Sequence, residues 1–171
     1  MAVSQKGTAG LKNSNFRETE FEIKIVLCIY ILKSKDMISK MTHISIHVLD
    51  QDRAYDFYTN KLGFKVITDV PMGSDGRWLT VSPPDQPGFE IILSPVSKSM
   101  YSAETVRALK EMVEKGTFGV GLFTSNDIFA TYEELKAKGV EFTKAPKKEF
   151  YGTEAIFKDD SGNWFSLAQL T

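Results

Sequence analysis

Residues 43–64 read HISIHVLDQDRAYDFYTNKLGF, and residues 119–140 read GVGLFTSNDIFATYEELKAKGV. Both stretches run from an alternating strand through a polar cap and an amphipathic helix to a glycine. Gly119 and Gly139 follow His43 and Gly63 by the same interval of 76 positions. A repeat of this length predicts two copies of one structural module, and the boundary between two such modules is a common place for a ligand.

The first copy begins with a strand whose side chains alternate between an apolar and a polar face. Ile44, Ile46 and Val48 share one face, and His43, Ser45 and His47 share the other. We expect Asp50 to cap a helix from about Asp52 to Leu62, which ends at Gly63 and covers the apolar face. Further strands are predicted at residues 64–68, 77–82 and 89–94.

The second copy repeats this order with other side chains. A helix is predicted at residues 127–138, with Ser125 or Asn126 as its cap and Gly139 at its end. Strands are predicted at residues 140–143, 155–158 and 164–168. Alternation in the first strand predicts one face made of Val120, Leu122 and Thr124 under the helix, and an opposite face made of Gly119, Gly121 and Phe123.

Each copy therefore has the order β-α-β-β-β, with one sheet face under its helix and one face open. We expect two such modules, residues 41–96 and 117–171, to form an α+β fold, a half-barrel cup of about eight strands. A helix at residues 102–115 lies within the predicted linker, residues 97–116. Modules and linker together make one domain, residues 41–171.

Residues 1–40 have a different composition, and we expect a disordered or peripheral extension there. Residues 1–20 are polar and have no apolar period. The apolar run at residues 21–32 is shorter than the roughly 20 residues that cross a bilayer. The alternative is an added strand or helix at a sheet edge or subunit contact, because Ile23, Ile25, Leu27 and Ile29 fall at every second position.

Charge and cysteine content limit the function classes. The formal net charge of the 171-residue chain is −1, and its Lys and Arg residues are concentrated in residues 1–40. The remaining domain is mildly acidic, which argues against nucleic acid as a partner. The single cysteine, Cys28, excludes an intrachain disulfide and a cysteine-based metal cage. A reducing, cytoplasmic setting without a membrane partner fits this composition.

The chain resembles the vicinal oxygen chelate superfamily, which includes glyoxalase I, bleomycin resistance proteins, fosfomycin resistance proteins and extradiol dioxygenases. The likeness rests on residues 43–50 leading into Ala54–Tyr58 and Leu62–Phe64, and on the turn at residues 159–163 before the last strand. It covers residues 41–171 and implies the paired β-α-β-β-β fold. It does not fix an activity, because this fold serves lyases, isomerases, dioxygenases, thiol transferases and plain binding proteins.

In metal-using relatives, four residues hold a divalent cation. Each module supplies one of them from its first strand and one from its last strand. Carried over to this chain, the first ligand is His43, and its counterpart Gly119 has no side chain to donate. The last-strand position of the second module falls on Ser166, a poor ligand, and that of the first module on Glu90 or Ile92. With His47 as a further donor, too few ligands remain for a full site.

The resemblance therefore implies a protein that binds a small organic molecule in the cup between its modules, without the family's full metal site, and forms a homodimer. We expect no cofactor. His43 and Glu90 are the candidate catalytic residues, should the protein be an enzyme. The candidate ligand-binding residues are His43, Ser45, His47, Trp78, Glu90, Phe123, Trp164 and Ser166.

Two rival functions remain open. One is a lyase, isomerase or dioxygenase of the glyoxalase I type that holds Zn, Ni, Mn or Fe through His43 and Glu90. The other is a structural or partner-binding domain with a closed, filled cup. The presence or absence of a pocket of ligand size separates the second rival from a binding protein.

Overall fold

The computed structural model describes residues 38–73 and 76–171. Contacts group residues 41–171 into one compact unit, which contains every strand and helix described below. Our expectations for residues 1–37, including the alternative of an added strand, lie outside the described residues. No helix in the described ranges is long and apolar enough to cross a membrane.

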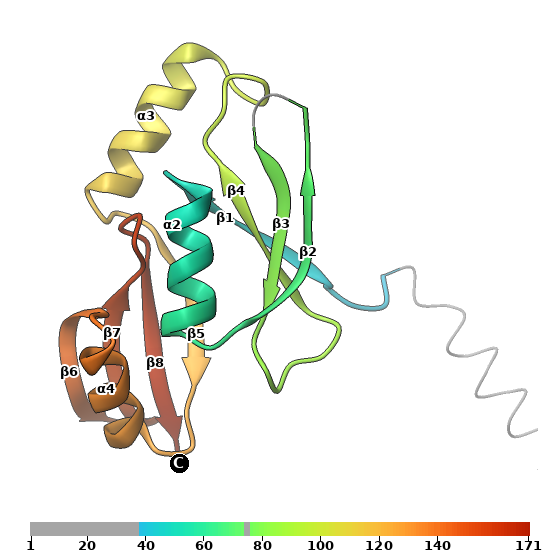
Figure 1. Cartoon of the computed structure of the whole chain (residues 1–171). Helices are drawn as coiled ribbons and strands as arrows, with labels where there is room; N and C mark the ends of the chain where they lie inside the picture. Colours follow the sequence, from blue (N-terminus) through green and yellow to red (C-terminus); the bar gives the residue numbers. More distant parts are fainter. Residues whose placement is uncertain (1–37, 74–75) are drawn as a thin grey trace, which may run out of the picture. The chain divides into compact units, whose positions relative to one another are not determined.

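Two four-stranded sheets follow the predicted repeat (Figure 1). The first sheet has the order β1-β4-β3-β2, and the second has the matching order β5-β8-β7-β6. The first and last strands of each module pair in parallel, and the other pairs are antiparallel. This confirms the tandem β-α-β-β-β half-barrel fold. The strands are β1 (His43–Val48), β2 (Lys65–Pro71), β3 (Arg77–Ser82), β4 (Glu90–Pro95), β5 (Gly119–Thr124), β6 (Glu141–Glu149), β7 (Gly152–Lys158) and β8 (Trp164–Leu170).

The helices of the two modules differ by one residue. The side chain of Asp50 caps α2 (Gln51–Asp56), which continues as the π-helical η1 (Phe57–Lys61). Asp127, rather than Ser125 or Asn126, caps α4 (Ile128–Ala137). Asp127 follows Asp50 by 77 positions, whereas Gly139 follows Gly63 by only 76. The segment between cap and glycine is therefore one residue longer in the first module, and the wider π-turn accommodates that residue. A third helix, α3 (Ala103–Glu114), lies in the predicted linker.

One apolar core runs through both modules on their helix-covered sides. Tyr58 is fully buried, and its ring contacts Phe165 of the second sheet at 6.5 Å between centroids. Phe64 contacts Phe123 of β5 in the same way, at 5.4 Å. In Figure 1, α2 accordingly lies between the two sheets. Buried residues of both modules belong to one cluster, among them Ile46, Val48, Leu79, Leu93, Ile128, Leu135, Phe157 and Leu167.

This arrangement decides where the open sheet faces lie. We expected the two open faces of one chain to enclose a common chamber. Instead, the modules contact each other through their helix-covered sides. Among the described residues, no hydrogen bond, ion pair or ring contact joins the two open faces. Each open face therefore remains available to a ligand or to another chain.

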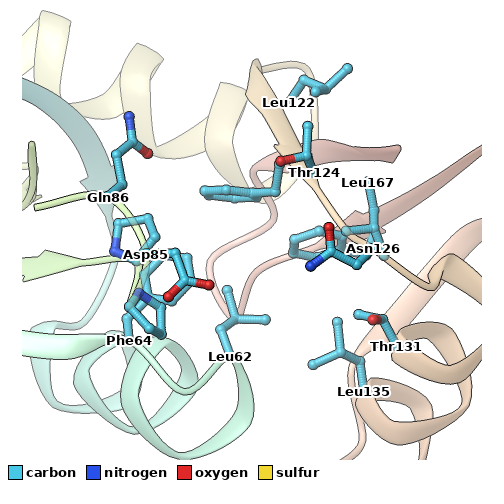
Figure 2. A pocket seen from close by; sticks show the side chains of 14 residues that line it. Leu62, Phe64, Asp85, Gln86, Leu122, Thr124, Asn126, Thr131, Leu135 and Leu167 are labelled. Carbon is cyan, nitrogen blue, oxygen red and sulfur yellow. The ribbon is translucent and has the colours of Figure 1, made fainter. Parts of the chain in front are cut away.

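A cleft of about 750 Å³ lies between the modules beside this core (Figure 2). One wall comes from the first module and the other from β5 and α4 of the second. The residues that line it are Leu62, Phe64, Pro83, Pro84, Asp85, Gln86, Leu122, Phe123, Thr124, Asn126, Thr131, Leu135, Phe157 and Leu167.

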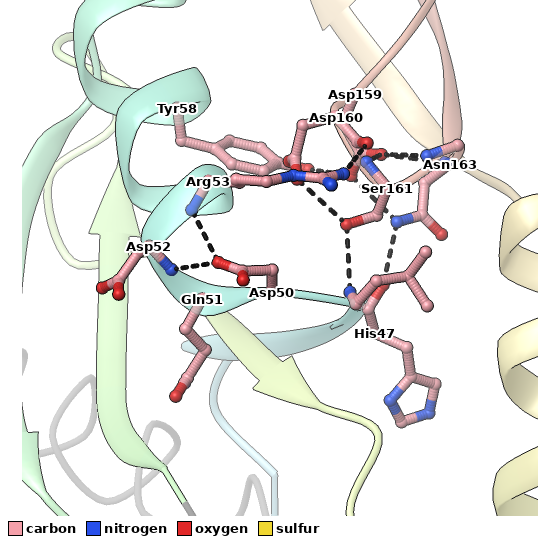
Figure 3. Close-up of polar contacts among 12 residues, drawn as sticks. His47, Asp50, Gln51, Asp52, Arg53, Tyr58, Asp159, Asp160, Ser161 and Asn163 are labelled. Carbon is pink, nitrogen blue, oxygen red and sulfur yellow. Dashed lines mark hydrogen bonds and ion pairs between the residues drawn. The ribbon is translucent and has the colours of Figure 1, made fainter.

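The turn between β7 and β8 fastens the second module to the first (Figure 3). Asp159 Oδ2 accepts hydrogen bonds from the Tyr58 hydroxyl and from Asn163 Nδ2, both at 2.9 Å. The other carboxylate oxygen accepts three backbone N–H groups of the turn at 2.8–2.9 Å. Asn163 Nδ2 also donates to the carbonyl of His47, and the N–H of Leu49 donates to Ser161 Oγ. These bonds compensate the burial of a charged group.

Asp160, the next residue of the turn, is compensated less well. Its Oδ2 lies 3.6 Å from Arg53 Nε, while its Oδ1 is buried and has no hydrogen-bond partner among the described residues. Burial, reinforced by the neighbouring charge of Asp159, raises the pKa of Asp160 to about 6. Burial also raises the pKa of Asp159, although the hydrogen bonds to Asn163 and Tyr58 oppose it.

The raised pKa of Asp160 predicts how stability changes with pH. A carboxyl group with a higher pKa in the folded than in the unfolded chain stabilises the fold below pH 4 and loses that contribution as pH rises to about 6. Asp160→Asn should remove most of this decline, which amounts to about 2 kcal/mol. The measurement is the free energy of urea unfolding at pH values between 4 and 7.

Glu133→Gln, at an exposed position on α4, serves as the matched control and should leave the pH profile unchanged. An Asp160→Asn variant that loses stability between pH 4 and 6 as steeply as the parent would contradict the prediction.

Candidate functional site

The open faces of the two sheets hold seven of the eight predicted ligand residues. On the first sheet these are His43, Ser45, His47, Trp78 and Glu90, and on the second they are Trp164 and Ser166. Each alternates along its strand with side chains of the core, such as Leu79 beside Trp78 and Phe165 beside Trp164. None of the seven lines the cleft between the modules.

Glu90 has two polar neighbours on the first sheet. The Thr80 hydroxyl donates to Glu90 Oε2 at 2.6 Å, and His43 Nε2 lies 3.6 Å from the same oxygen. The His43 side chain is 41% exposed and that of Glu90 is 23% exposed, so a ligand on this face can reach both. Arg77 does not pair with Glu90; its guanidinium pairs with Asp52 and Asp69.

Strand pairing resolves whether Glu90 or Ile92 corresponds to Ser166. Ile92 lies opposite Thr80, and Ser166 lies opposite Ile156, which follows Thr80 by the repeat interval. On the first strands, His43 lies opposite Glu90 and its counterpart Gly119 lies opposite Trp164. Ile92 is therefore the counterpart of Ser166, and Glu90 is the counterpart of Trp164.

Gly119 has a steric reason to lack a side chain. A Cβ atom at this position would lie 2.2 Å from Cζ2 of Trp164, well inside van der Waals contact. The indole thus covers the backbone at the place where His43 projects in the first module. The same pair of sheet positions holds an imidazole and a carboxylate in one module and an aromatic surface in the other.

Phe123 is the eighth predicted residue, and our assignment of its face is wrong. The β5–β8 register shifts between Gly119 and Gly121, so one extra residue is inserted into β5. Beyond the shift, Leu122 lies opposite Ser166 on the open face, and Phe123 lies opposite Leu167 in the core. Phe123 lines the cleft between the modules instead.

A charged network on the second sheet was not predicted. Lys144 Nζ lies 2.7 Å from Glu154 Oε2 and 2.7 Å from Glu149 Oε1, and the Ser166 hydroxyl donates to Glu154 Oε1 at 2.8 Å. The hydrogen bond from Lys144 lowers the pKa of Glu154, and the hydrogen bond to Glu154 raises the pKa of Tyr151. Alternating charges on the β6–β7 hairpin were the available signal.

The two networks resemble each other in design. In each module a hydroxyl on a neighbouring strand holds a carboxylate on the open face: Thr80 holds Glu90, and Ser166 holds Glu154. The basic side chain beside the carboxylate differs, since it is Lys144 in one module and His43 in the other. The open faces thus present both charged and hydrogen-bonding groups next to a tryptophan.

His47 lies apart from the carboxylates. Its ring packs edge-on against Tyr101 at 5.7 Å, and its Nδ1 is buried without a hydrogen-bond partner. Its backbone carbonyl accepts the bond from Asn163 described above.

The donors of the open faces do not fit the family's metal site. Residues 38–73 and 76–171 contain no group of three or more His, Cys, Asp and Glu side chains that could hold an ion together. His43 and Glu90 form only a pair, and divalent cations in proteins need more ligands than that. The position that would supply a third ligand, Gly119, is covered by Trp164.

Comparison with known proteins agrees with this fold. The YurT protein of Bacillus subtilis (strain 168), described as uncharacterized, is 42% identical over 131 residues, which cover 76% of this chain and 98% of YurT. The crystal structure of UcmS2 is 47% identical, with a TM-score of 0.74, and covers 77% of this chain and 98% of its own. TnmS3, described as an antibiotic binding protein from Streptomyces sp. CB03234, is 30% identical, with a TM-score of 0.62, and covers 79% and 98%.

A family model also matches most of the domain described above. It is described as the Glyoxalase/Bleomycin resistance protein/Dioxygenase superfamily and matches residues 40–167. This range includes both modules and the helix between them. Together with the tandem β-α-β-β-β topology, this match shows that the chain belongs to the glyoxalase, bleomycin resistance protein and dioxygenase superfamily.

Proposed function

We propose that this protein binds a small organic molecule on its open sheet faces and acts as a binding protein rather than a metal-dependent enzyme. The position of Trp164 over Gly119 carries this proposal. Where metal-using relatives carry a first-strand ligand, this chain offers an aromatic ring. TnmS3, a relative whose description is that of an antibiotic binding protein, supports the same class of function.

The side chains favour a flat ligand with polar groups at its edge. Trp78 and Trp164 are the two tryptophans of the chain, and both lie on open faces. Indole rings stack on planar apolar groups. Glu90 with His43, and Glu154 with Lys144, then supply charged hydrogen-bond partners at the edges of such a molecule.

We further propose that a second copy of the chain completes the cup. Val70 and Trp78 on the first sheet and Leu122 on the second are 48%, 37% and 49% exposed. Apolar side chains of this kind are commonly buried when subunits associate. An open face of one copy placed against an open face of the other would enclose the chamber that one chain does not enclose. The lone cysteine, Cys28, favours a reducing, cytoplasmic setting for this dimer.

The second candidate function is a lyase, isomerase or dioxygenase that uses a divalent metal. The observation that favours it is the short distance of 3.6 Å between His43 Nε2 and Glu90 Oε2 on an accessible face. A metal held there would act as a Lewis acid toward oxygens of the substrate. His43 and Glu90 would hold it, with water or substrate as the remaining ligands.

Tryptophan fluorescence should report ligand binding directly. Bleomycin and a panel of aromatic natural products, titrated into the protein, should include compounds that quench or shift the emission. For such a compound, Trp164→Ala should weaken binding about tenfold, because a stacking surface is lost. Phe129→Ala removes a ring that is 61% exposed on α4 and is the matched control. Equal affinity for the parent and for Trp164→Ala would count against the open-face site.

Metal content separates the two candidate functions. Protein purified without chelator should carry less than about 0.1 equivalent of Zn, Ni, Mn or Fe, because two donors do not retain an ion through purification. Elemental analysis measures this. One equivalent of metal that is lost in His43→Ala and kept in His47→Ala would overturn the metal-free proposal and favour the metal-dependent candidate function.

The oligomeric state tests the shared cup. Sedimentation velocity should give a dimer for the full chain. The double substitution Val70→Glu and Leu122→Glu should give a monomer, because charges would enter the apolar contact. Phe129→Glu, at a position that is 61% exposed on α4 and away from the open faces, should remain dimeric. A parent protein that sediments as a monomer at about 0.1 mM would refute the shared cup.

A further inference from the structure

The two sides of the contact between the modules differ: one is joined by hydrogen bonds, and the other contains the cleft. On the closed side, the turn after β7 reaches the first helix, where Asp159 meets Tyr58. The matching turn of the first module lies between β3 and β4. Its Gly88, with φ of 79°, corresponds to Gly162, with φ of 112°. Counting back three residues from each glycine makes Asp85 the counterpart of Asp159.

The helix position that should meet Asp85 has changed. Counted from the caps Asp50 and Asp127, the counterpart of Tyr58 is Leu135. Leucine has no hydroxyl group, so Asp85 cannot form the bond that closes the other side. Both residues instead line the cleft of about 750 Å³, where Figure 2 shows them on opposite walls.

The lining of this cleft is suited to one chemical class. Its inner wall includes Phe64, Phe123 and Phe157, whose rings contact one another at 5.4 and 6.3 Å. Asp85 is the only charged lining residue, and no described residue forms a hydrogen bond or ion pair with its carboxylate. Asn126 and Thr131 add neutral polar groups on the opposite wall. The volume lies within the range of about 300–1,000 Å³ found for small-molecule sites.

We propose that this cleft is a second binding site for a small organic cation with an aromatic or otherwise apolar body; it shares Leu122 with an open face but none of the residues proposed to bind the open-face ligand. The body packs against the phenylalanine wall, and the cationic head lies at the mouth beside Asp85. Most of the affinity comes from apolar burial, because Asp85 is exposed and an ion pair in water contributes little. The carboxylate sets the preference for a positive charge.

Two probes with the same ring and opposite charge test the proposal. 2-Naphthylmethylammonium and 2-naphthoate are titrated separately into the full-length chain, with leucine methyl groups observed by NMR. The cation should shift the methyl signals of Leu62, Leu135 and Leu167, and it should bind about fivefold more tightly than the anion. Asp85→Asn should remove that preference. The double substitution Trp78→Ala and Trp164→Ala should leave it unchanged, which separates this cleft from the open-face site.

A filling substitution provides an independent check. Leu135→Tyr places a hydroxyl at the position matching Tyr58 and should abolish the cation-induced shifts. If that variant does not fold, as judged by circular dichroism, Gln86→Trp at the exposed rim fills the mouth instead. The proposal is overturned if neither probe shifts these methyl groups at concentrations up to about 5 mM. At that concentration even a ligand with a millimolar dissociation constant would occupy the cleft. Equal binding of both probes, or shifts confined to the two indole N–H groups, would overturn it as well.

Discussion

The buried carboxylate of Asp159 fixes how the two modules meet. It accepts three backbone bonds within its own turn and two side-chain bonds, one of them from Tyr58 of the other module. A buried acid is tolerated only when such partners replace water. Because Tyr58 belongs to the helix that covers the first sheet, the contact draws the helix-covered sides together. Both open faces therefore lie outside the contact between the modules, where the candidate ligand residues remain accessible.

The two open faces carry different side chains at equivalent positions of their first and last strands. The position that carries His43 in the first module carries Gly119 in the second, and the facing residue changes from Glu90 to Trp164. These changes depend on each other, because the indole occupies the space that any side chain at 119 would need. Replacing Gly119 alone by histidine would therefore not place an imidazole beside a carboxylate in the second module. An imidazole and a carboxylate in the first module correspond to an aromatic surface in the second, and both positions differ together.

The sequence predicted the elements well and their faces less well. Helix caps, glycine ends and strand order depend on neighbouring residues, so the repeat could be found from local patterns. The insertion in β5 could not, because Val120, Leu122 and Phe123 are all apolar and fit either face. The register of Glu90 depends on pairing with β1 and β3. The Tyr58–Asp159 bond joins residues 101 positions apart, and no local pattern marks it.

The two equivalent turns contact the opposite module differently: Asp159 bonds to Tyr58, whereas Asp85 forms no such bond to Leu135. The closed turn, in which Asp159 accepts five bonds, joins the two modules on one side through Tyr58. The corresponding turn of the first module forms no such bond, and its exposed Asp85 can vary without the loss of a buried hydrogen bond. That exposed turn is thus a surface on which substitutions cost little stability. Such a surface is where a second binding property can develop while the first site keeps its geometry.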